Sequence, residues 1–116
     1  MKVIVLGAGL VGAPMALDLA KGSEFKVTVA DISRKNLDKF KNDNIATVEM
    51  DLDNEAALIE VLKNHDLVLN AVPGFMGYRT TERILRAGKN VVDISFFPED
   101  ALELDGLAKE NGVTAI

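Results

Sequence analysis

Three glycines near the start of the chain have the spacing of a phosphate-binding turn. Gly7, Gly9 and Gly12 form the pattern G-x-G-x-x-G directly after an apolar run, VIVL. Such glycines allow a tight turn, let a pyrophosphate approach the backbone, and let the following helix pack closely on the strand. The backbone N–H groups of Leu10, Val11 and Gly12 would then point at the phosphates. A tight turn without a ligand explains the same glycines, so the motif alone does not decide.

An acidic residue lies where a dinucleotide-binding site needs one. The fingerprint expects an acid about 20 residues after the last glycine, and Asp31 follows the apolar run VTVA there. Its carboxylate would accept hydrogen bonds from the adenosine ribose and repel a 2′-phosphate, which predicts an adenine dinucleotide and favours NAD over NADP. Ser33 and Arg34 follow directly and are able to hold a 2′-phosphate, so NADP stays open. The structural alternative for Asp31 is a carboxylate that begins a turn.

Residues that end two further strands are candidates for the rest of the same ligand. Asp51, after the run ATVEM, is placed to accept a hydrogen bond from an adenine amino group, or to begin the turn before the next helix. Ala71, Val72 and Pro73 end the fourth predicted strand, where a cofactor crosses the sheet. Small residues there leave room for a ribose and a nicotinamide, although any buried strand would use the same residues.

Two other groups near predicted strand ends are weaker candidates. Asp93 and Ser95 suggest an acid or a nucleophile, but a serine nucleophile needs a neighbouring base and no histidine lies near them in the sequence. We therefore assign no catalytic residue and no metal ligand. Several apolar side chains are placed to cover a ligand, to contact another domain or to close the core: Phe75, Met76, Phe96 and Phe97.

The elements that must position these residues follow a regular alternation. Apolar runs predict strands at 3–6, 27–30, 46–49, 67–72, 91–94 and 113–116. Between them, helical patterns run over 10–21, 33–41, 54–63, 78–87 and 101–111, with Ser33 as a helix cap. Short connections between strands and helices require right-handed crossovers. The sequence therefore predicts an α/β fold of the Rossmann type, doubly wound, with a six-stranded, mostly parallel sheet and helices on both faces.

Size, charge and composition exclude several classes of protein. The 116 residues suit one domain, 1–116, and are too few for a separate substrate domain. A net charge of −5 with scattered basic residues argues against nucleic acid and anionic membranes as partners. The chain has no cysteine, which excludes disulfides and thiolate chemistry and favours a cytoplasmic location. We expect no membrane span and no signal peptide before the first strand.

Several stretches together resemble one protein family. They are MKVIVLGAGLVGAPMALDLA, VTVADIS, VEMDLDN, LVLNAVPGF and NVVDISFFPE, and they span nearly the whole chain. In this combination the sequence resembles the N-terminal cofactor domain of the saccharopine dehydrogenase and lysine 6-dehydrogenase family. The resemblance implies an NAD(P)-dependent oxidoreductase that acts on a C–N bond of an amino acid. It also implies a second domain that holds the substrate and usually mediates dimerisation.

The resemblance assigns cofactor contacts to four segments of the chain. It implies a phosphate turn at Gly7, Gly9, Leu10, Val11 and Gly12. It implies an adenosine ribose edge at Asp31, Ile32 and Ser33, which Arg34 follows. It places adenine beside Asp51 and Leu52, and the nicotinamide ribose beside Ala71, Val72 and Pro73.

The sequence predicts a cofactor domain that depends on another part of a protein for its activity. Hydride transfer requires a substrate held against the nicotinamide with water excluded, and one open sheet edge does not provide this. We therefore expect the domain to be inactive alone, whether it is a natural half or a piece of a longer chain. Two alternatives stay open: a nucleotide-sensing regulatory module of a channel or transporter, and a structural fold without useful affinity.

Overall fold

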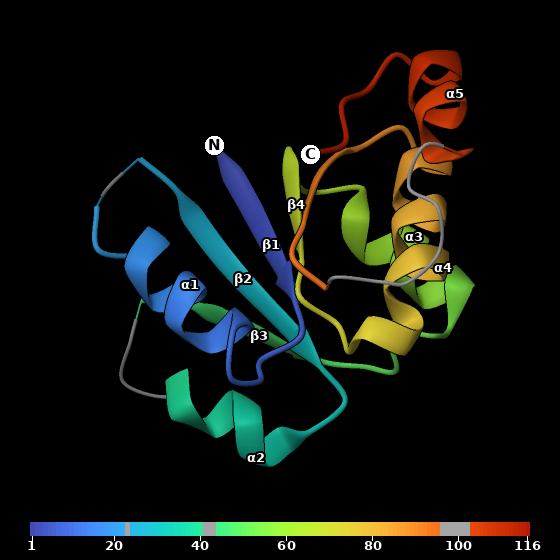
Figure 1. The fold of residues 1–116 in the computed structure, drawn as a ribbon. Helices are drawn as coiled ribbons and strands as arrows, with labels where there is room; N and C mark the ends of the chain where they lie inside the picture. Colours follow the sequence, from blue (N-terminus) through green and yellow to red (C-terminus); the bar gives the residue numbers. More distant parts are fainter. Residues whose placement is uncertain (23, 41–43, 96–102) are drawn as a thin grey trace.

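Five parallel strands form the sheet at the centre of the molecule. The computed structural model describes residues 1–22, 24–40, 44–95 and 103–116. The strand order is β3-β2-β1-β4-β5 (Figure 1), and neighbouring strands all pair in parallel. The strands are β1 (Lys2–Leu6), β2 (Lys26–Asp31), β3 (Ala46–Glu49), β4 (Leu67–Asn70) and β5 (Asn90–Asp93). Because they run in one direction, their last residues meet at the same edge.

Helices cover both faces of this sheet. In Figure 1, α1 and α2 lie on one side and α3 and α4 on the other. The helices are α1 (Gly12–Leu19), α2 (Arg34–Leu37), α3 (Glu55–Leu62), α4 (Gly74–Arg86) and α5 (Glu103–Glu110), with a 3-10 turn at Asp38–Phe40.

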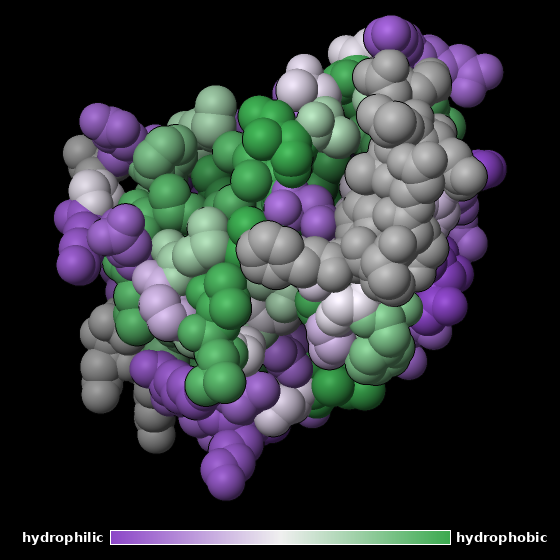
Figure 2. Space-filling view, viewed as in Figure 1, coloured by the Kyte–Doolittle hydropathy of each residue, from purple (hydrophilic) through white to green (hydrophobic). Residues whose placement is uncertain are grey.

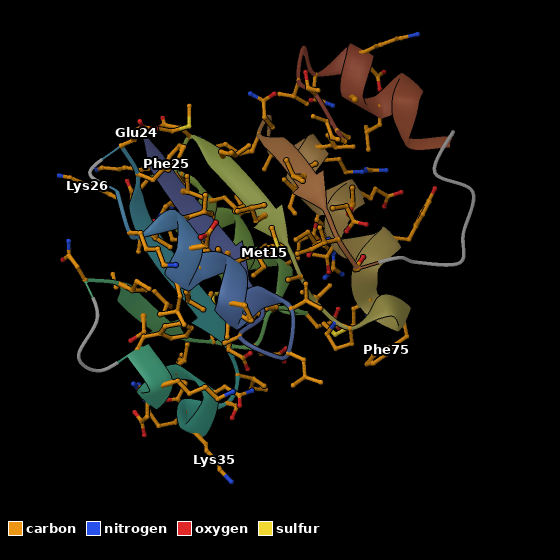
Figure 3. All side chains as sticks on the ribbon, turned by 60° about the vertical axis from the view of Figure 1, so that its left-hand side comes forward. Met15, Glu24, Phe25, Lys26, Lys35 and Phe75 are labelled. Atoms are coloured by element: carbon orange, nitrogen blue, oxygen red, sulfur yellow. The ribbon has the colours of Figure 1, made fainter. Side chains whose placement is uncertain are left out.

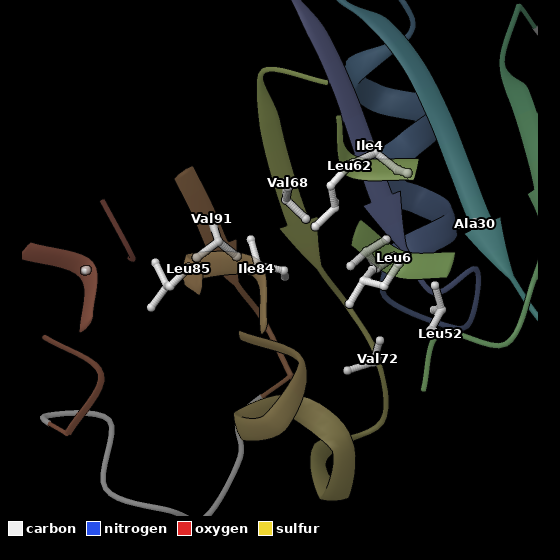
Figure 4. Close-up of a cluster of buried hydrophobic side chains, with 12 residues drawn as sticks. Ile4, Leu6, Ala30, Leu52, Leu62, Val68, Val72, Ile84, Leu85 and Val91 are labelled. Carbon is white, nitrogen blue, oxygen red and sulfur yellow. The ribbon is translucent and has the colours of Figure 1, made fainter. Parts of the chain in front are cut away.

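The central strand supplies side chains to two separate hydrophobic clusters. Val3 and Val5 of β1 join the cluster under α1 and α2, whereas Ile4 and Leu6 join the cluster under α3, α4 and α5 (Figure 4). This division follows from the alternation of side chains along a strand. All four are fully buried, as expected for a parallel sheet covered on both faces. The predicted Rossmann-type, doubly wound architecture is confirmed.

The sheet has five strands rather than the six predicted. The last residues run beside β5, where Val91 N–H donates to Thr114 O at 2.9 Å and Ile116 N–H donates to Val91 O at 3.0 Å. Among the described residues, this segment forms a single bridge, between Val91 and Ala115. The turn at Gly112, with φ at +64°, leads into this segment. The predicted strand at 113–116 is therefore reduced to this bridge.

The helix after β4 begins earlier than the sequence predicted. The sequence predicts a helix over 78–87, whereas α4 starts at Gly74 with Pro73 as its cap residue. Met76 N–H donates to Pro73 O at 2.9 Å. A proline suits a helix start because the first N–H groups of a helix need no partner within it. Strand β4 accordingly ends at Asn70.

Two predicted helix starts are stabilised by side-chain caps. The hydroxyl of Ser33 accepts from Asn36 N–H at 3.2 Å, which confirms it as the cap of α2. The amide oxygen of Asn54 accepts from Ala57 N–H at 3.1 Å at the start of α3. The caps follow β2 and β3, which end at the same edge of the sheet. They define where α2 and α3 begin beside that edge. None of the helices in the described ranges is long and apolar enough to cross a membrane.

Candidate functional site

The three motif glycines differ in whether packing requires a glycine at their position. Gly7 has a φ of +99°, and a Cβ there would lie 2.6 Å from Ala71 O. A Cβ on Gly12 would lie 2.0 Å from Gly7 O, so only glycine lets α1 start this close to the turn. A Cβ on Gly9 would meet nothing within 4 Å in the described part of the chain. Packing thus accounts for two of the glycines, and the third faces open space.

Asp31 joins the glycine turn to the loop after β2. Its Oδ2 accepts from Ala8 N–H at 2.7 Å, and its Oδ1 accepts from Ser33 N–H at 2.8 Å. The second contact is the turn that the sequence left open as the structural alternative for this residue. The first contact fixes the turn after β1. A carboxylate offers about four acceptor positions, so Asp31 still has capacity for a ribose hydroxyl.

A cavity of about 820 Å³ lies at the carboxyl edge of the sheet. Its size falls within the range of small-molecule and cofactor sites. Most of the predicted residues line it: Gly7, Gly9, Leu10, Val11, Asp31, Ile32, Ser33, Asp51, Leu52, Ala71, Val72 and Pro73. Gly12 and Arg34 are not among its lining residues: Gly12 packs against the turn, and Arg34 pairs with Glu49. The fold thus brings together four segments that are far apart in the sequence.

The cavity also has lining residues that the cofactor prediction did not include. They are Asn36, Asp53, Phe75, Met76, Arg79, Ile94 and Ser95. Arg79 and Asp53 show why the sequence does not predict such residues. They are 26 positions apart and come together because α4 passes the loop after β3. Nη2 of Arg79 lies 2.8 Å from Asp53 Oδ1, and Arg83 donates to Asp53 O at 2.9 Å. Asp53 thereby ties this loop to α4.

Asp51 makes a local contact in the same loop. Its Oδ1 accepts from Asp53 N–H at 2.9 Å, and its carbonyl oxygen accepts from Asn54 N–H at 3.0 Å. This is the turn before α3 that the sequence allowed as one of two roles. Because the side chain also lines the cavity, the turn holds the carboxylate at the cavity wall.

The ends of β2 and β3 are joined by an ion pair. Arg34 Nε and Nη2 lie 3.0 and 2.9 Å from Glu49 Oε1. Glu49 is the last residue of β3 and the register partner of Asp31. Asp31, Ser33, Arg34 and Glu49 therefore form one polar edge beside the cavity.

A buried polar network lies where β4 and β5 end. The fully buried Asn70 donates through Nδ2 to Thr81 Oγ1 and Asp93 Oδ1, both at 3.0 Å. Ser95 Oγ donates to the same Asp93 oxygen at 2.7 Å. Ser95 lines the cavity, so the network reaches its wall. Within the described ranges, no group of three or more histidine, aspartate or glutamate side chains is placed to hold a metal ion.

Exposed apolar side chains surround the cavity. Leu10 is 95% and Phe75 78% exposed, and Val11 and Ile32 are also exposed. Figure 3 shows Phe75 at the start of α4, pointing away from the fold. In Figure 2, hydrophobic surface covers the strands and α1, with hydrophilic surface over α2 below it. Phe96 and Phe97, which the sequence suggested as a cover or interface, lie outside the described residues.

Comparison with known proteins identifies the family. The family model described as the saccharopine dehydrogenase NADP binding domain matches residues 3–116. A saccharopine dehydrogenase [NADP(+), L-glutamate-forming] from Pyricularia oryzae is 31% identical over 99% of this chain and 26% of its own length. The mitochondrial alpha-aminoadipic semialdehyde synthase of Mus musculus is 26% identical over 99% of this chain, which spans 13% of that protein. The chain therefore covers about a quarter or less of these relatives.

Solved structures agree with the sequence matches. The apo saccharopine dehydrogenase (L-Glu forming) from Saccharomyces cerevisiae superimposes with a TM-score of 0.86 at 26% identity, over 98% of this chain and 26% of that one. A 3-ketoreductase from Actinomadura kijaniata, solved with NADP, reaches 0.81 at 23% identity over 100% of this chain and 36% of that one, a likeness of fold. Over residues 3–116, this chain belongs to the saccharopine dehydrogenase NADP-binding domain family.

Proposed function

We propose that the cavity at the carboxyl edge binds an adenine dinucleotide. The observation that carries this proposal is Gly9, which lines the cavity and which no contact among the described residues requires to be glycine. A pyrophosphate at the start of α1 would occupy that open space and meet the backbone N–H groups of the helix start. The adenosine ribose would lie at Asp31, and the nicotinamide ribose beside Ala71.

Within this proposal, NADP is favoured over NAD. The family description and the names of the fungal relatives specify NADP. The side chains support this choice, because Ser33 and Arg34 stand at the ribose edge as donors for a 2′-phosphate. Asp31, from which the sequence favoured NAD, directs both carboxylate oxygens to backbone N–H groups. Its charge is thereby partly compensated, which weakens the argument against a 2′-phosphate.

As part of a longer protein, the domain would serve an oxidoreductase that acts on a C–N bond of an amino acid. A bound nicotinamide supplies the hydride chemistry, and the turn, Asp31 and Ala71 would orient it. The exposed Leu10 and Phe75 at the rim are consistent with a cover from another domain, which would exclude water from the reaction. In this proposal, that other domain would also bind the substrate and mediate dimerisation. The cytoplasmic location stays a prediction, and the comparisons do not favour a channel or transporter module.

The test is calorimetric titration of this chain with NADP and with NAD, before and after Gly9→Ala. We expect Gly9→Ala to fold normally and to lose at least about tenfold in affinity for both nucleotides, because the new Cβ enters the phosphate space. Gly22→Ala is the matched control, because a Cβ there would meet only Glu24 N at 4.0 Å, an ordinary contact, and the residue lies at the opposite edge of the sheet. Failure of the unaltered chain to bind either nucleotide at millimolar concentration would refute the proposal.

A further inference from the structure

The guanidinium group beside the proposed ribose edge already has an anionic partner. Nε and Nη2 of Arg34 both contact Oε1 of Glu49, at 3.0 and 2.9 Å. The two residues are 15 positions apart, and parallel pairing of β2 with β3 brings them together. Glu49 therefore occupies the group that a 2′-phosphate would need.

The neighbouring carboxylate has a different role. Asp31 is the register partner of Glu49, but its oxygens accept backbone N–H groups of Ala8 and Ser33. Asp31 is thus committed to the turn. In the described part of the chain, the side chain of Glu49 instead contacts Arg34, which the ligand would also use. Of the two acids at this edge, Glu49 is the one that competes directly for Arg34.

We infer that Glu49 is a specificity-determining residue, because it competes with the 2′-phosphate of NADP for Arg34. This inference rests on the proposed function of the cavity. NAD has no 2′-phosphate and leaves the Arg34–Glu49 pair intact. NADP binds fully only after the guanidinium exchanges Glu49 for the phosphate. Glu49 therefore lowers the affinity for NADP relative to NAD.

The exposure of the pair makes this exchange feasible. The side chains of Arg34 and Glu49 are 57% and 47% exposed. Solvent-exposed ion pairs are weak, since water screens their attraction and both side chains lose freedom. A phosphate dianion carries more charge than a carboxylate and accepts two parallel hydrogen bonds from one guanidinium. The phosphate can thus displace Glu49, at a cost that depends on the strength of the pair.

The experiment measures dissociation constants of NADP and NAD by calorimetry for the unaltered chain and for Glu49→Gln. We expect Glu49→Gln to bind NADP about fivefold more tightly, the upper range for release of an exposed pair, with NAD unchanged. In the Arg34→Ala variant, adding Glu49→Gln should leave the ratio of the NADP and NAD dissociation constants unaltered. Arg34, for which Glu49 and the 2′-phosphate compete, is then absent. Glu60→Gln is the matched control: it removes the same charge and an exposed pair with Lys63.

The outcomes separate this inference from the proposed function. If the chain binds a dinucleotide but Glu49→Gln leaves the NADP to NAD ratio unchanged, the inference is wrong and the proposed function stands. If the ratio changes equally with and without Arg34, competition for Arg34 is also refuted. If neither nucleotide binds to any folded variant, both the inference and the proposed function fail. Circular dichroism spectra that match the unaltered chain establish that each variant is folded.

Discussion

Ala8 N–H donates to Asp31 Oδ2 at 2.7 Å, so the turn after β1 is anchored to the end of β2. One carboxylate thus connects the two segments that form the phosphate and ribose parts of the proposed site. Its other oxygen holds Ser33 N–H, at the cap of α2. The residue that the sequence suggested for a ligand also shapes the site before any ligand arrives.

Asp31→Ala should therefore destabilise the fold as well as weaken nucleotide binding. Two partly buried N–H groups lose their acceptor, for which we expect a loss of about 1–3 kcal/mol in the free energy of unfolding. Urea denaturation measures this loss. Lys35→Ala, on the exposed side of α2 (Figure 3), is a control that should change little. Unchanged stability of Asp31→Ala would contradict the anchoring role.

Gly12→Ala should be far more harmful to folding than Gly9→Ala. The Cβ of residue 12 would overlap the carbonyl oxygen of Gly7, and backbone does not move aside easily. We expect a loss of about 3 kcal/mol for Gly12→Ala by overpacking. For Gly9→Ala we expect no loss, or a small gain because alanine restricts the unfolded chain. Thermal unfolding of the two variants side by side gives the comparison, and similar melting temperatures would contradict it.

Thr80→Val should leave the stability unchanged or raise it by up to about 1 kcal/mol. Thr80 lies in α4, and its buried hydroxyl has no hydrogen-bond partner in the described part of the chain. Valine keeps the shape and removes the cost of burying an unpaired polar group. Guanidinium denaturation measures the change.

Asn70→Ala is the contrasting substitution in the same region. The side-chain nitrogen of Asn70 donates to Gly77 O, Thr81 Oγ1 and Asp93 Oδ1, so its removal takes three hydrogen bonds from this region. We expect a loss of about 1–3 kcal/mol in the free energy of unfolding. A comparable loss in Thr80→Val would mean that its hydroxyl has a partner after all.

Asp53→Ala should produce a small, salt-dependent loss of stability. Asp53 contacts both Arg79 and Arg83, but its side chain is 45% exposed. Screening by solvent limits the effect to about 1 kcal/mol, and added salt should reduce the difference from the unaltered chain. Urea denaturation at low and high salt measures it. A loss that does not respond to salt would indicate that packing of the loop, rather than charge, is responsible.

The alternation of strands and helices along the chain could be predicted from the sequence, and so could a sheet covered by helices on both faces. Val3 and Val5 form a run with Ile4 and Leu6, and such a run predicts a strand buried on both sides. Ser33 could be predicted as a cap because its hydroxyl acts within three residues. These features depend on neighbours in the sequence, and local chemistry determines them.

Other features could not be predicted, because they depend on how distant segments meet. The pairing of Arg34 with Glu49 requires the register of β2 against β3, and that of Arg79 with Asp53 requires the path of α4. The early start of α4 differs from the prediction because Pro73, expected to end the fourth strand, caps the helix instead. The division of Asp31 between Ala8 and Ser33 needs the closed turn, which no spacing describes.

Because β1 lies at the centre of the sheet, its two faces are covered by parts of the chain that are synthesised at different times. Chains emerge from the ribosome N-terminus first, so α1, which follows β1 directly, can cover Val3 and Val5 while the rest is still being made. Ile4 and Leu6 stay exposed to solvent until α3 and α4, which are synthesised later, pack against them. A nascent chain halted before β4 would thus expose the apolar face of β1 that carries Ile4 and Leu6. Chaperone binding should be strongest at this stage of synthesis.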